Sequence, residues 1–218
     1  MHLSELRLPI RLYDILSNSI GELRPSQEKA VQSGLLEGAS LLVCTPTASG
    51  KTLIAEIACL KSILESNGRA IYIVPLKALA TEKFKDFSSR YGHIARIALA
   101  IGDVDSAEPR LADYDLIVCT AEKLDSLLRH KVSWVSLVSV VVVDEIHLLT
   151  DTSRGPTLEV LITMLRKLLP KLQIIGLSAT IGNPLELSQW LDASLVEDSW
   201  RPVKLHQGVY VNGELEFY

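Results

Sequence analysis

Short apolar runs alternate with helical patterns along most of the chain, and this alternation strongly limits the folds that it can adopt. Several of the apolar runs lack the in-and-out alternation of a half-exposed strand, which is typical of strands covered on both faces. The pattern therefore predicts an α/β fold with a mostly parallel sheet, right-handed crossovers and helices on both faces. The predicted strands are residues 40–44, 70–74, 97–101, 116–119, 138–143 and 173–177, and the predicted helices are residues 51–65, 76–90, 121–129, 157–169 and 184–191.

The two ends of the chain depart from this alternation. Residues 1–38 have helical patterns and no strand pattern, so we expect them to form a helical cap ahead of the first strand. Residues 209–218 alternate in polarity on both sides of Asn212-Gly213, a dipeptide that favours the type I′ turn of a β-hairpin. The expected organisation is a helical segment over 1–38, an α/β domain over 39–200, and an exit segment with a hairpin over 201–218.

The overall charge and the cysteines exclude several classes of protein. The formal net charge is −4, so any contact with nucleic acid must be local, through a few basic side chains or helix N-termini. Cys44, Cys59 and Cys119 lie far apart in apolar runs, which argues against a disulfide framework or a metal site and favours buried core thiols. No apolar run approaches the roughly 20 residues of a membrane span, and the first residues lack the apolar block of a signal peptide. We therefore expect a cytoplasmic protein with no membrane segment.

The segment Thr45-Pro-Thr-Ala-Ser-Gly-Lys-Thr52 follows a predicted strand and begins a predicted helix. It matches the phosphate-binding pattern G-x-x-x-x-G-K-[ST], except that Thr45 replaces the first glycine. In such a loop, successive backbone N–H groups bind phosphate at the positive end of a helix. Gly50 allows close approach of the backbone, Lys51 is expected to reach the β- and γ-phosphates of ATP, and Thr52 is expected to bind Mg²⁺. A turn of small residues that precedes a helix by chance is the alternative. The predicted ATP-binding residues of this segment are Thr45, Pro46, Thr47, Ala48, Ser49, Gly50, Lys51 and Thr52.

A second motif follows the apolar run at residues 138–143, which leads directly into Asp144-Glu145-Ile146-His147. Two adjacent carboxylates at a buried strand end repel each other and lose hydration, unless a divalent cation compensates for their charge. Asp144 is expected to hold Mg²⁺ through water, and Glu145 is expected to orient and deprotonate the attacking water. His147 is expected to point to the same side as Glu145 on a strand-like continuation, toward the γ-phosphate, although it could instead cap or pack locally. Taken alone, the acidic pair could be a solvated turn.

The two motifs are expected to share one magnesium–nucleotide complex. Ligands of parallel α/β sheets bind at the carboxyl ends of the strands, and both motifs follow a predicted strand. We therefore expect the turn at Gly50-Lys51-Thr52 and the pair Asp144-Glu145 to meet at neighbouring strand ends. The predicted metal ligands are Thr52 and Asp144, and the predicted catalytic residues are Lys51, Asp144, Glu145 and His147.

These motifs resemble those of superfamily 2 helicases of the DExH type, and further matches resemble the Ski2-like group of that superfamily. Leu23-Arg-Pro-Ser-Gln27 resembles its adenine-reading Q motif, and Val74-Pro-Leu-Lys-Ala-Leu79 resembles motif Ia. Thr120-Ala-Glu-Lys123 resembles motif Ib, and Ser178-Ala-Thr180 resembles motif III. Residues 122–129, 154–156, 182–183, 190–191 and 200–203 are similar to the archaeal DNA repair helicases of the Hjm and HelQ type. The resemblance covers nearly the whole chain.

The resemblance implies an ATP- and magnesium-dependent DNA helicase that moves 3′ to 5′ on single-stranded or forked DNA and acts in fork repair. Such a motor has two RecA-like domains, and the second carries an arginine finger. No Gln-x-x-Gly-Arg-x-Gly-Arg box follows Ser178-Ala-Thr180 in this chain. The chain therefore resembles the first RecA-like P-loop NTPase domain alone, with residues 39–200 as the ATP-binding domain and a second RecA-like domain as its partner.

The Q motif and motif III contribute further expected site residues through this resemblance. Gln27 is expected to read the adenine edge together with Arg24, because its amide both donates and accepts hydrogen bonds. The alternative for Gln27 is a surface position on a helix. Ser178 and Thr180 are expected to couple the nucleotide to the DNA by bonding Asp144 and its neighbours, or else to cap the next helix.

Residues for nucleic-acid contact follow from motifs Ia and Ib. Lys77 and Thr120 precede predicted helices, whose N-termini suit DNA phosphates, although they could equally be a solvated lysine and a helix cap. The implied nucleic-acid residues are Pro75, Lys77, Thr120, Glu122, Lys123, Arg154 and Gly155.

Two other functions remain open from the sequence. An RNA helicase of the Ski2 type would share these motifs, because RNA is distinguished by its 2′-OH and no residue of this chain indicates a reader of that group. A nucleotide-binding module without unwinding activity is the third possibility, because phosphoryl transfer falls on the order of 10³-fold or more without an arginine finger.

Overall fold

The predicted strands pair into one parallel sheet, which confirms the α/β fold. The computed structural model describes residues 1–102, 109–204, 206, 208–211 and 213–217. The strands of the sheet are β1 (Leu41–Cys44), β2 (Arg69–Val74), β3 (Ile97–Ala100), β4 (Leu116–Thr120), β5 (Val138–Val143), β6 (Gln173–Ser178) and β7 (Ser194–Glu197). They are ordered β3-β4-β2-β5-β6-β1-β7, and each described pair is parallel.

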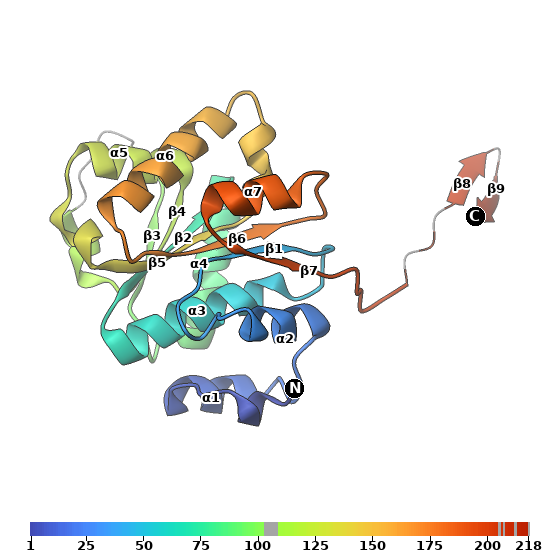
Figure 1. The fold of residues 1–218 in the computed structure, drawn as a ribbon, viewed down its shortest axis with the longest axis horizontal. Coiled ribbons are helices and arrows are strands. Elements are labelled where there is room, and N and C mark those ends of the chain that lie inside the picture. The colour runs from blue at the N-terminus through green and yellow to red at the C-terminus, as the bar shows by residue number, and fades with distance from the viewer. Residues whose placement is uncertain (103–108, 205, 207, 212, 218) are drawn as a thin grey trace.

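Helices cover both faces of this sheet, as the sequence predicts (Figure 1). One face carries α1 (Ile10–Ser17), α2 (Pro25–Gln32), α3 (Lys51–Ser66) and α4 (Lys77–Tyr91). The other face carries α5 (Ala121–Arg129), α6 (Gly155–Leu168) and α7 (Pro184–Leu191). Short 3-10 helices are η1 (Leu3–Glu5), η2 (Pro109–Asp113), η3 (Ser133–Leu137) and η4 (Ile146–Thr150).

Each face of the sheet has its own apolar core. In β2, Tyr72 packs into the core that α3 and α4 cover, whereas Ile71 and Ile73 pack into the core of α5 and α6. Because both faces are buried, the strand sequences are continuously apolar rather than alternating. The expected core thiols are also confirmed: Cys44 and Cys119 are buried, and burial raises their pKa to about 11 and about 12.

The sequence pattern missed the edge strand β7. Only two of its residues are apolar, and Ser194 and Glu197 at its ends are exposed. The strand forms because its backbone pairs with β1, from Leu41 opposite Ser194 to Cys44 opposite Glu197. Such pairing depends on the neighbouring strand rather than on side-chain burial, so hydrophobic periodicity does not detect it.

The two ends of the chain match their expected structures. Residues 1–38 form η1, α1 and α2 without a strand, apart from an isolated bridge between His2 and Glu22. Near the other end, β8 (Gly208–Val211) and β9 (Glu214–Phe217) form the expected antiparallel hairpin, which lies away from the sheet in Figure 1. The type I′ turn expected at Asn212-Gly213 includes Asn212, which lies outside the described residues. Within the described part of the chain, no helix combines the length and apolar character that crossing a membrane requires.

Candidate active site

The loop between β1 and α3 adopts the backbone conformation that an anion-binding loop needs. Ala48 and Gly50 have left-handed φ angles of 65° and 94°, and α3 begins immediately afterwards at Lys51. Turns that mix right- and left-handed residues gather backbone N–H groups into an anion-binding concavity. Glycine is favoured at position 50 by this left-handed φ angle, and a Cβ there would lie 2.5 Å from Nε2 of Gln27, so the Gln27 side chain would have to move.

Side chains of this loop form hydrogen bonds with other residues of the same loop. The Thr45 and Ser49 hydroxyls lie 2.8 Å apart and are buried. Thr45, which replaces the first glycine of the phosphate-binding pattern, therefore has a hydrogen-bonding partner in Ser49, and the sequence did not indicate this partner. Lys51 Nζ donates to the carbonyl oxygens of Thr45 at 2.8 Å and Pro46 at 3.3 Å. Burial lowers the pKa of Lys51, while the nearby carboxylates of Glu145 and Asp144 act in the opposite direction.

The acidic pair lies directly after β5, and both carboxylate oxygens of Asp144 accept hydrogen bonds from the protein. The Tyr72 hydroxyl donates to Oδ2 of Asp144 at 3.0 Å, and the backbone N–H of Glu145 donates to Oδ1 at 3.1 Å. Burial and the charge of Asp144 raise the pKa of Tyr72 well above its usual value, so this hydroxyl remains a donor. Tyr72 was not identified from the sequence, because its strand pattern only marks it as a core residue.

The expected strand-like continuation to His147 is wrong. Glu145 has a left-handed φ of 53°, which ends the strand, and the following residues form η4. The helical turn nevertheless brings Nδ1 of His147 to 3.3 Å from Oε2 of Glu145. Glu145 and His147 therefore lie close together because the chain turns between them, and not because they share one side of a continued strand.

The loop and the acidic pair lie at the same end of the sheet, but not on neighbouring strands as we expected. In the strand order, β6 separates β1 from β5, and its last residue, Ser178, lies between the two motifs. Ser178 Oγ lies 3.4 Å from Nδ1 of His147, and its carbonyl accepts a hydrogen bond from the N–H of Thr45. Thr180 is exposed. Among the described residues, neither Ser178 nor Thr180 bonds Asp144, and the N-cap residue of α7 is Asn183 rather than either of them.

The Q-motif residues contact the phosphate-binding loop directly. Gln27 is buried: its Oε1 accepts from the Arg24 N–H at 2.9 Å, and its Nε2 donates to the Gly50 carbonyl at 3.0 Å. The surface alternative for Gln27 is therefore excluded, and its amide keeps one N–H and one lone pair for another partner. The Arg24 guanidinium donates to the Ala48 carbonyl at 2.8 Å and lies 5.4 Å from the ring centroid of Trp200. Arg24 and Gln27 also line a cavity of about 440 Å³ that extends to α3 and α4.

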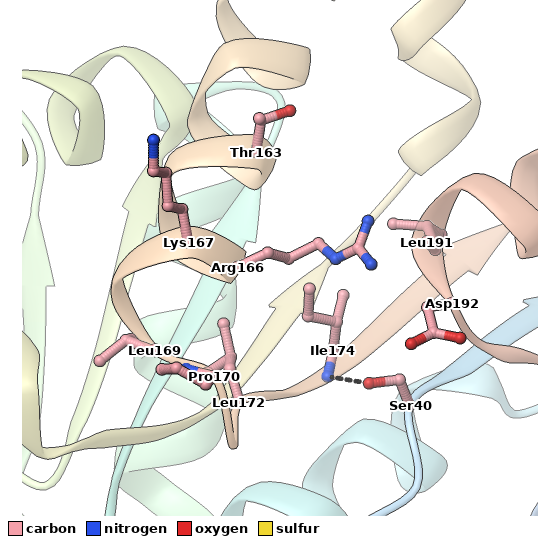
Figure 2. A pocket seen from close by; sticks show the side chains of 10 residues that line it. All are labelled: Ser40, Thr163, Arg166, Lys167, Leu169, Pro170, Leu172, Ile174, Leu191 and Asp192. Carbon is pink, nitrogen blue, oxygen red and sulfur yellow. Dashed lines mark hydrogen bonds between the residues drawn. The ribbon is translucent and has the colours of Figure 1, made fainter.

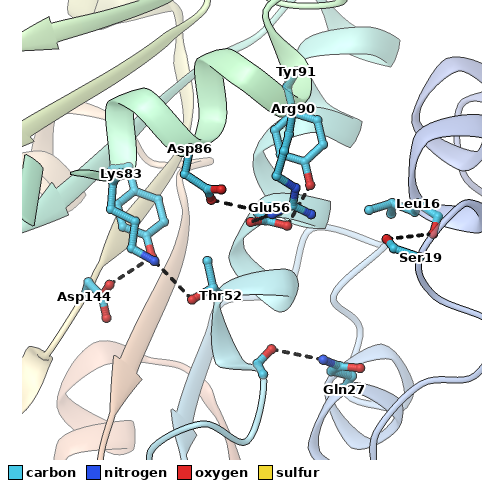
Figure 3. A network of polar contacts seen from close by, with 12 residues as sticks. Leu16, Ser19, Gln27, Thr52, Glu56, Lys83, Asp86, Arg90, Tyr91 and Asp144 are labelled. Carbon is cyan, nitrogen blue, oxygen red and sulfur yellow. Dashed lines mark hydrogen bonds and ion pairs between the residues drawn. The ribbon is translucent and has the colours of Figure 1, made fainter. Parts of the chain in front are cut away.

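The oxygen atoms of Thr52 and Asp144 fit a magnesium ion in their chemistry, because Mg²⁺ prefers hard oxygen ligands. The structure places a cationic side chain, Lys83, beside Thr52. Lys83 Nζ donates to Thr52 Oγ1 at 3.2 Å (Figure 3), and it lies 5.7 Å from the ring of Tyr72, the partner of Asp144. Within the described ranges no three acidic, histidine or cysteine side chains gather into a metal site. Magnesium in proteins commonly keeps several waters and binds substrate phosphates beside one or two carboxylates.

A buried carboxylate ties α3 to α4 behind this site. Glu56 of α3 accepts from Nη1 of Arg90 at 2.6 Å and from the Tyr91 hydroxyl at 2.7 Å (Figure 3). Burial and the adjacent Glu56 raise the pKa of Tyr91, which keeps its hydroxyl protonated as a donor. No motif marks these residues, because partners more than thirty residues apart leave no local pattern; Glu56 and Tyr91 are separated by 35.

The residues expected to contact nucleic acid divide into two groups. Pro75, Glu122 and Arg154 line one small pocket together with Asp144 and Glu145, so the structure brings motifs Ia, Ib and the acidic pair together. Lys77 is exposed at the first position of α4.

Three other residues of the expected nucleic-acid set do not lie on the surface. Thr120, Lys123 and Gly155 are buried. Lys123 lies on α5 beside the core residues Leu124 and Leu127, and Thr120 is the last residue of the buried strand β4. Their contact with nucleic acid stays a prediction.

Another cavity, of about 360 Å³, lies between the ends of α6 and α7 (Figure 2). Its lining includes Arg166 and Lys167 of α6 and also Ser40 and Leu172, which precede β1 and β6. The cavity therefore lies at the amino ends of these strands, whereas the loop that begins at Thr45 lies at their carboxyl ends. It is not part of the candidate active site.

A phosphate-binding loop and an acidic pair at the carboxyl edge of a parallel sheet define the class of RecA-like P-loop NTPase domains. Within that class, the chain belongs to the DEAD/DEAH box helicase family, whose model matches residues 24–187.

Similar proteins of known sequence include several that are described as ATP-dependent DNA helicases. The chain is 52% identical, over 98% of its length, to the ATP-dependent DNA helicase Hel308 of Pyrococcus horikoshii, of which the match covers 30%. It is 54% identical, over 95% of its length, to ATP-dependent DNA helicase Hel308 of Methanocaldococcus jannaschii, of which the match covers 18%. The chain therefore spans less than a third of the length of these relatives.

The fold is also similar to crystal structures of the DUF1998 helicase MrfA. The DNA-bound structure superimposes with a TM-score of 0.72 at 26% identity, over 88% of this chain and 30% of that chain. A second MrfA structure gives a TM-score of 0.72 at 29% identity, over 88% and 33% of the two chains.

Proposed function

We propose that this chain is the ATP-binding motor domain of an ATP-dependent DNA helicase. The observation that carries the proposal is the position of the loop at Lys51 and of the pair Asp144-Glu145 at the same carboxyl end of the parallel sheet. The identity of about half of the residues to proteins described as ATP-dependent DNA helicases supports the same conclusion.

The proposed roles follow from the geometry of the site. Lys51 would exchange its bonds to the loop carbonyls for bonds to the β- and γ-phosphates, and Thr52 and Asp144 would hold Mg²⁺. Magnesium, when bound, neutralises charge on the transferred phosphate group. Glu145 orients the attacking water and takes its proton, and His147, in contact with Glu145, faces the γ-phosphate.

The nucleotide base is proposed to lie beside the Q motif. Gln27 already bonds Gly50 and Arg24, and its remaining N–H and lone pair suit the adenine edge. Because Gln27 and Arg24 both bond the loop, base and phosphates would be recognised by one connected unit.

The polymer substrate is proposed to be single-stranded or forked DNA. Pro75, Lys77, Glu122 and Arg154 are the candidates for backbone contact, because they lie on the surface or line the pocket beside the acidic pair. A second RecA-like domain would supply the arginine finger, with residues 39–200 as the first motor domain. Movement from 3′ to 5′ follows from the family resemblance.

The test combines binding and turnover of the 218-residue chain. Calorimetry should detect ATP–Mg²⁺ binding, and Glu145→Gln should retain that affinity while hydrolysis is lost. Without an arginine finger, we expect hydrolysis to be slower than in complete helicases by on the order of 10³-fold, with little stimulation by DNA. Normal hydrolysis by the Glu145→Gln variant would show that another group is the base, and stimulation by single-stranded RNA but not DNA would favour an RNA helicase.

A further inference from the structure

Lys83 brings a positive charge into the candidate metal site, although no sequence motif includes it. Its ammonium donates to Thr52 Oγ1 at 3.2 Å (Figure 3), and it lies 5.7 Å and 5.9 Å from the ring centroids of Tyr72 and Phe87. Ammonium groups near aromatic faces gain electrostatic stabilisation from the rings. The side chain therefore has a defined position beside the hydroxyl that is proposed to bind magnesium.

The position of Lys83 is fixed by the helix that carries it. Lys83 and Arg90 lie about two turns apart on α4, so they project from the same side of that helix. Arg90 and the following Tyr91 both bind the buried Glu56 of α3, the helix that also carries Thr52. The same pair of helices is thus joined at two places, by the Glu56 cluster and by the contact between Lys83 and Thr52.

Both oxygen groups proposed for the metal are bonded by protein donors. Thr52 Oγ1 accepts from Lys83, and Asp144 Oδ2 accepts from the hydroxyl of Tyr72. Tyr72 is neutral and its hydrogen bond leaves the charge of Asp144 intact, whereas Lys83 is a cation. A magnesium ion that binds Thr52 would lie within a few ångströms of this ammonium, and two positive charges at that separation repel each other.

We propose that Lys83 is a positioning residue that competes with magnesium for the Thr52 hydroxyl and so sets the magnesium concentration at which nucleotide binds. This inference rests on the proposed function. With magnesium bound, the Lys83 ammonium would have to leave Thr52, and this competition raises the magnesium concentration that is needed for half-maximal nucleotide binding.

The experiment measures binding of fluorescent N-methylanthraniloyl ADP to the 218-residue chain as the magnesium concentration is varied. In Lys83→Met the aliphatic stem remains against the two rings while the charge is removed. Half-saturating magnesium should fall about five- to tenfold in this variant, because one charge repulsion is lost. Lys85→Met is the matched control, since Lys85 is exposed on the same helix, and its half-saturating magnesium should remain at the wild-type value.

Binding of the same nucleotide in EDTA separates this role from that of a phosphate ligand. Lys83→Met should bind with wild-type affinity without a divalent ion, and a lower affinity in EDTA would overturn the proposal. Unchanged half-saturating magnesium in Lys83→Met would overturn it as well. If circular dichroism shows that this variant is unfolded, Lys83→Gln replaces it, with the same fall in half-saturating magnesium expected. Failure of the wild-type chain to bind the nucleotide at any magnesium concentration would instead reject the proposed function.

Discussion

Tyr91→Phe tests how strongly the buried Glu56 cluster holds α3 and α4 together. The substitution removes the hydroxyl that donates to Glu56 Oε2 at 2.7 Å and leaves the packing of the ring against Phe87 in place. Tyr91 is fully buried and the Glu56 side chain is only 2% exposed, so water cannot replace the lost donor. A hydrogen bond to a charged group contributes about 1.5–3 kcal/mol, and Arg90 still compensates the other carboxylate oxygen. We therefore expect a loss of about 2 kcal/mol in the free energy of unfolding.

Urea denaturation followed by tryptophan fluorescence measures this loss. The midpoint should fall while the slope with urea stays constant, because the same surface is exposed on unfolding. In a thermal melt, a loss of this size should lower Tm by roughly 4–8 °C for a domain of this length. The matched control is Tyr13→Phe, because Tyr13 is half-buried and its hydroxyl bonds no other described residue. Tyr13→Phe should change the free energy of unfolding by no more than about 0.5 kcal/mol.

The comparison of the two variants decides whether the reasoning is correct. If Tyr91→Phe destabilises the chain no more than Tyr13→Phe does, the hydroxyl of Tyr91 does not stabilise the Glu56 carboxylate, and the cluster does not connect the two helices. A double-mutant cycle with Glu56→Gln adds a direct measure, since contacting residues couple by about 0.5–3 kcal/mol and independent residues do not.

Two further variants test the loop and the start of α6. Lys51→Ala should weaken ATP binding more than ADP binding, because the lysine is assigned to the γ-phosphate as well as the β-phosphate; equal losses in calorimetry would contradict that assignment. Asp151 accepts hydrogen bonds from the Ser153 hydroxyl and from the N–H groups of Ser153 and Arg154, which lower its pKa from 3.8 to about 2. Because the folded pKa lies below the unfolded one, the stabilisation is present above pH 3.8 and is lost as the pH falls toward 2. Asp151→Asn should therefore lower Tm at pH 7, and the difference from wild type should shrink below pH 4; a constant difference down to pH 2 would rule this out.

Much of the architecture was determined by the sequence alone, because its signals are local. The runs at β5, α5 and α7 begin and end at the residues that the pattern predicts. Apolar periodicity reports which side chains a strand or helix buries, and turn chemistry reports where it stops, so both can be read from adjacent residues. The phosphate-binding loop and the acidic pair could be located for the same reason, since each is a short motif that directly follows a strand.

Tertiary structure decided the features that depend on distant partners. The order of the strands places β6 between the two motifs, and the left-handed Glu145 turns the chain into η4 rather than a continued strand. Tyr72 bonds Asp144 across 72 positions, and Lys83 bonds Thr52 across 31. Burial of Lys123 likewise depends on what α5 packs against. A hydrogen bond between distant residues leaves no period in the sequence, so only the folded chain shows which donors meet at the candidate magnesium site.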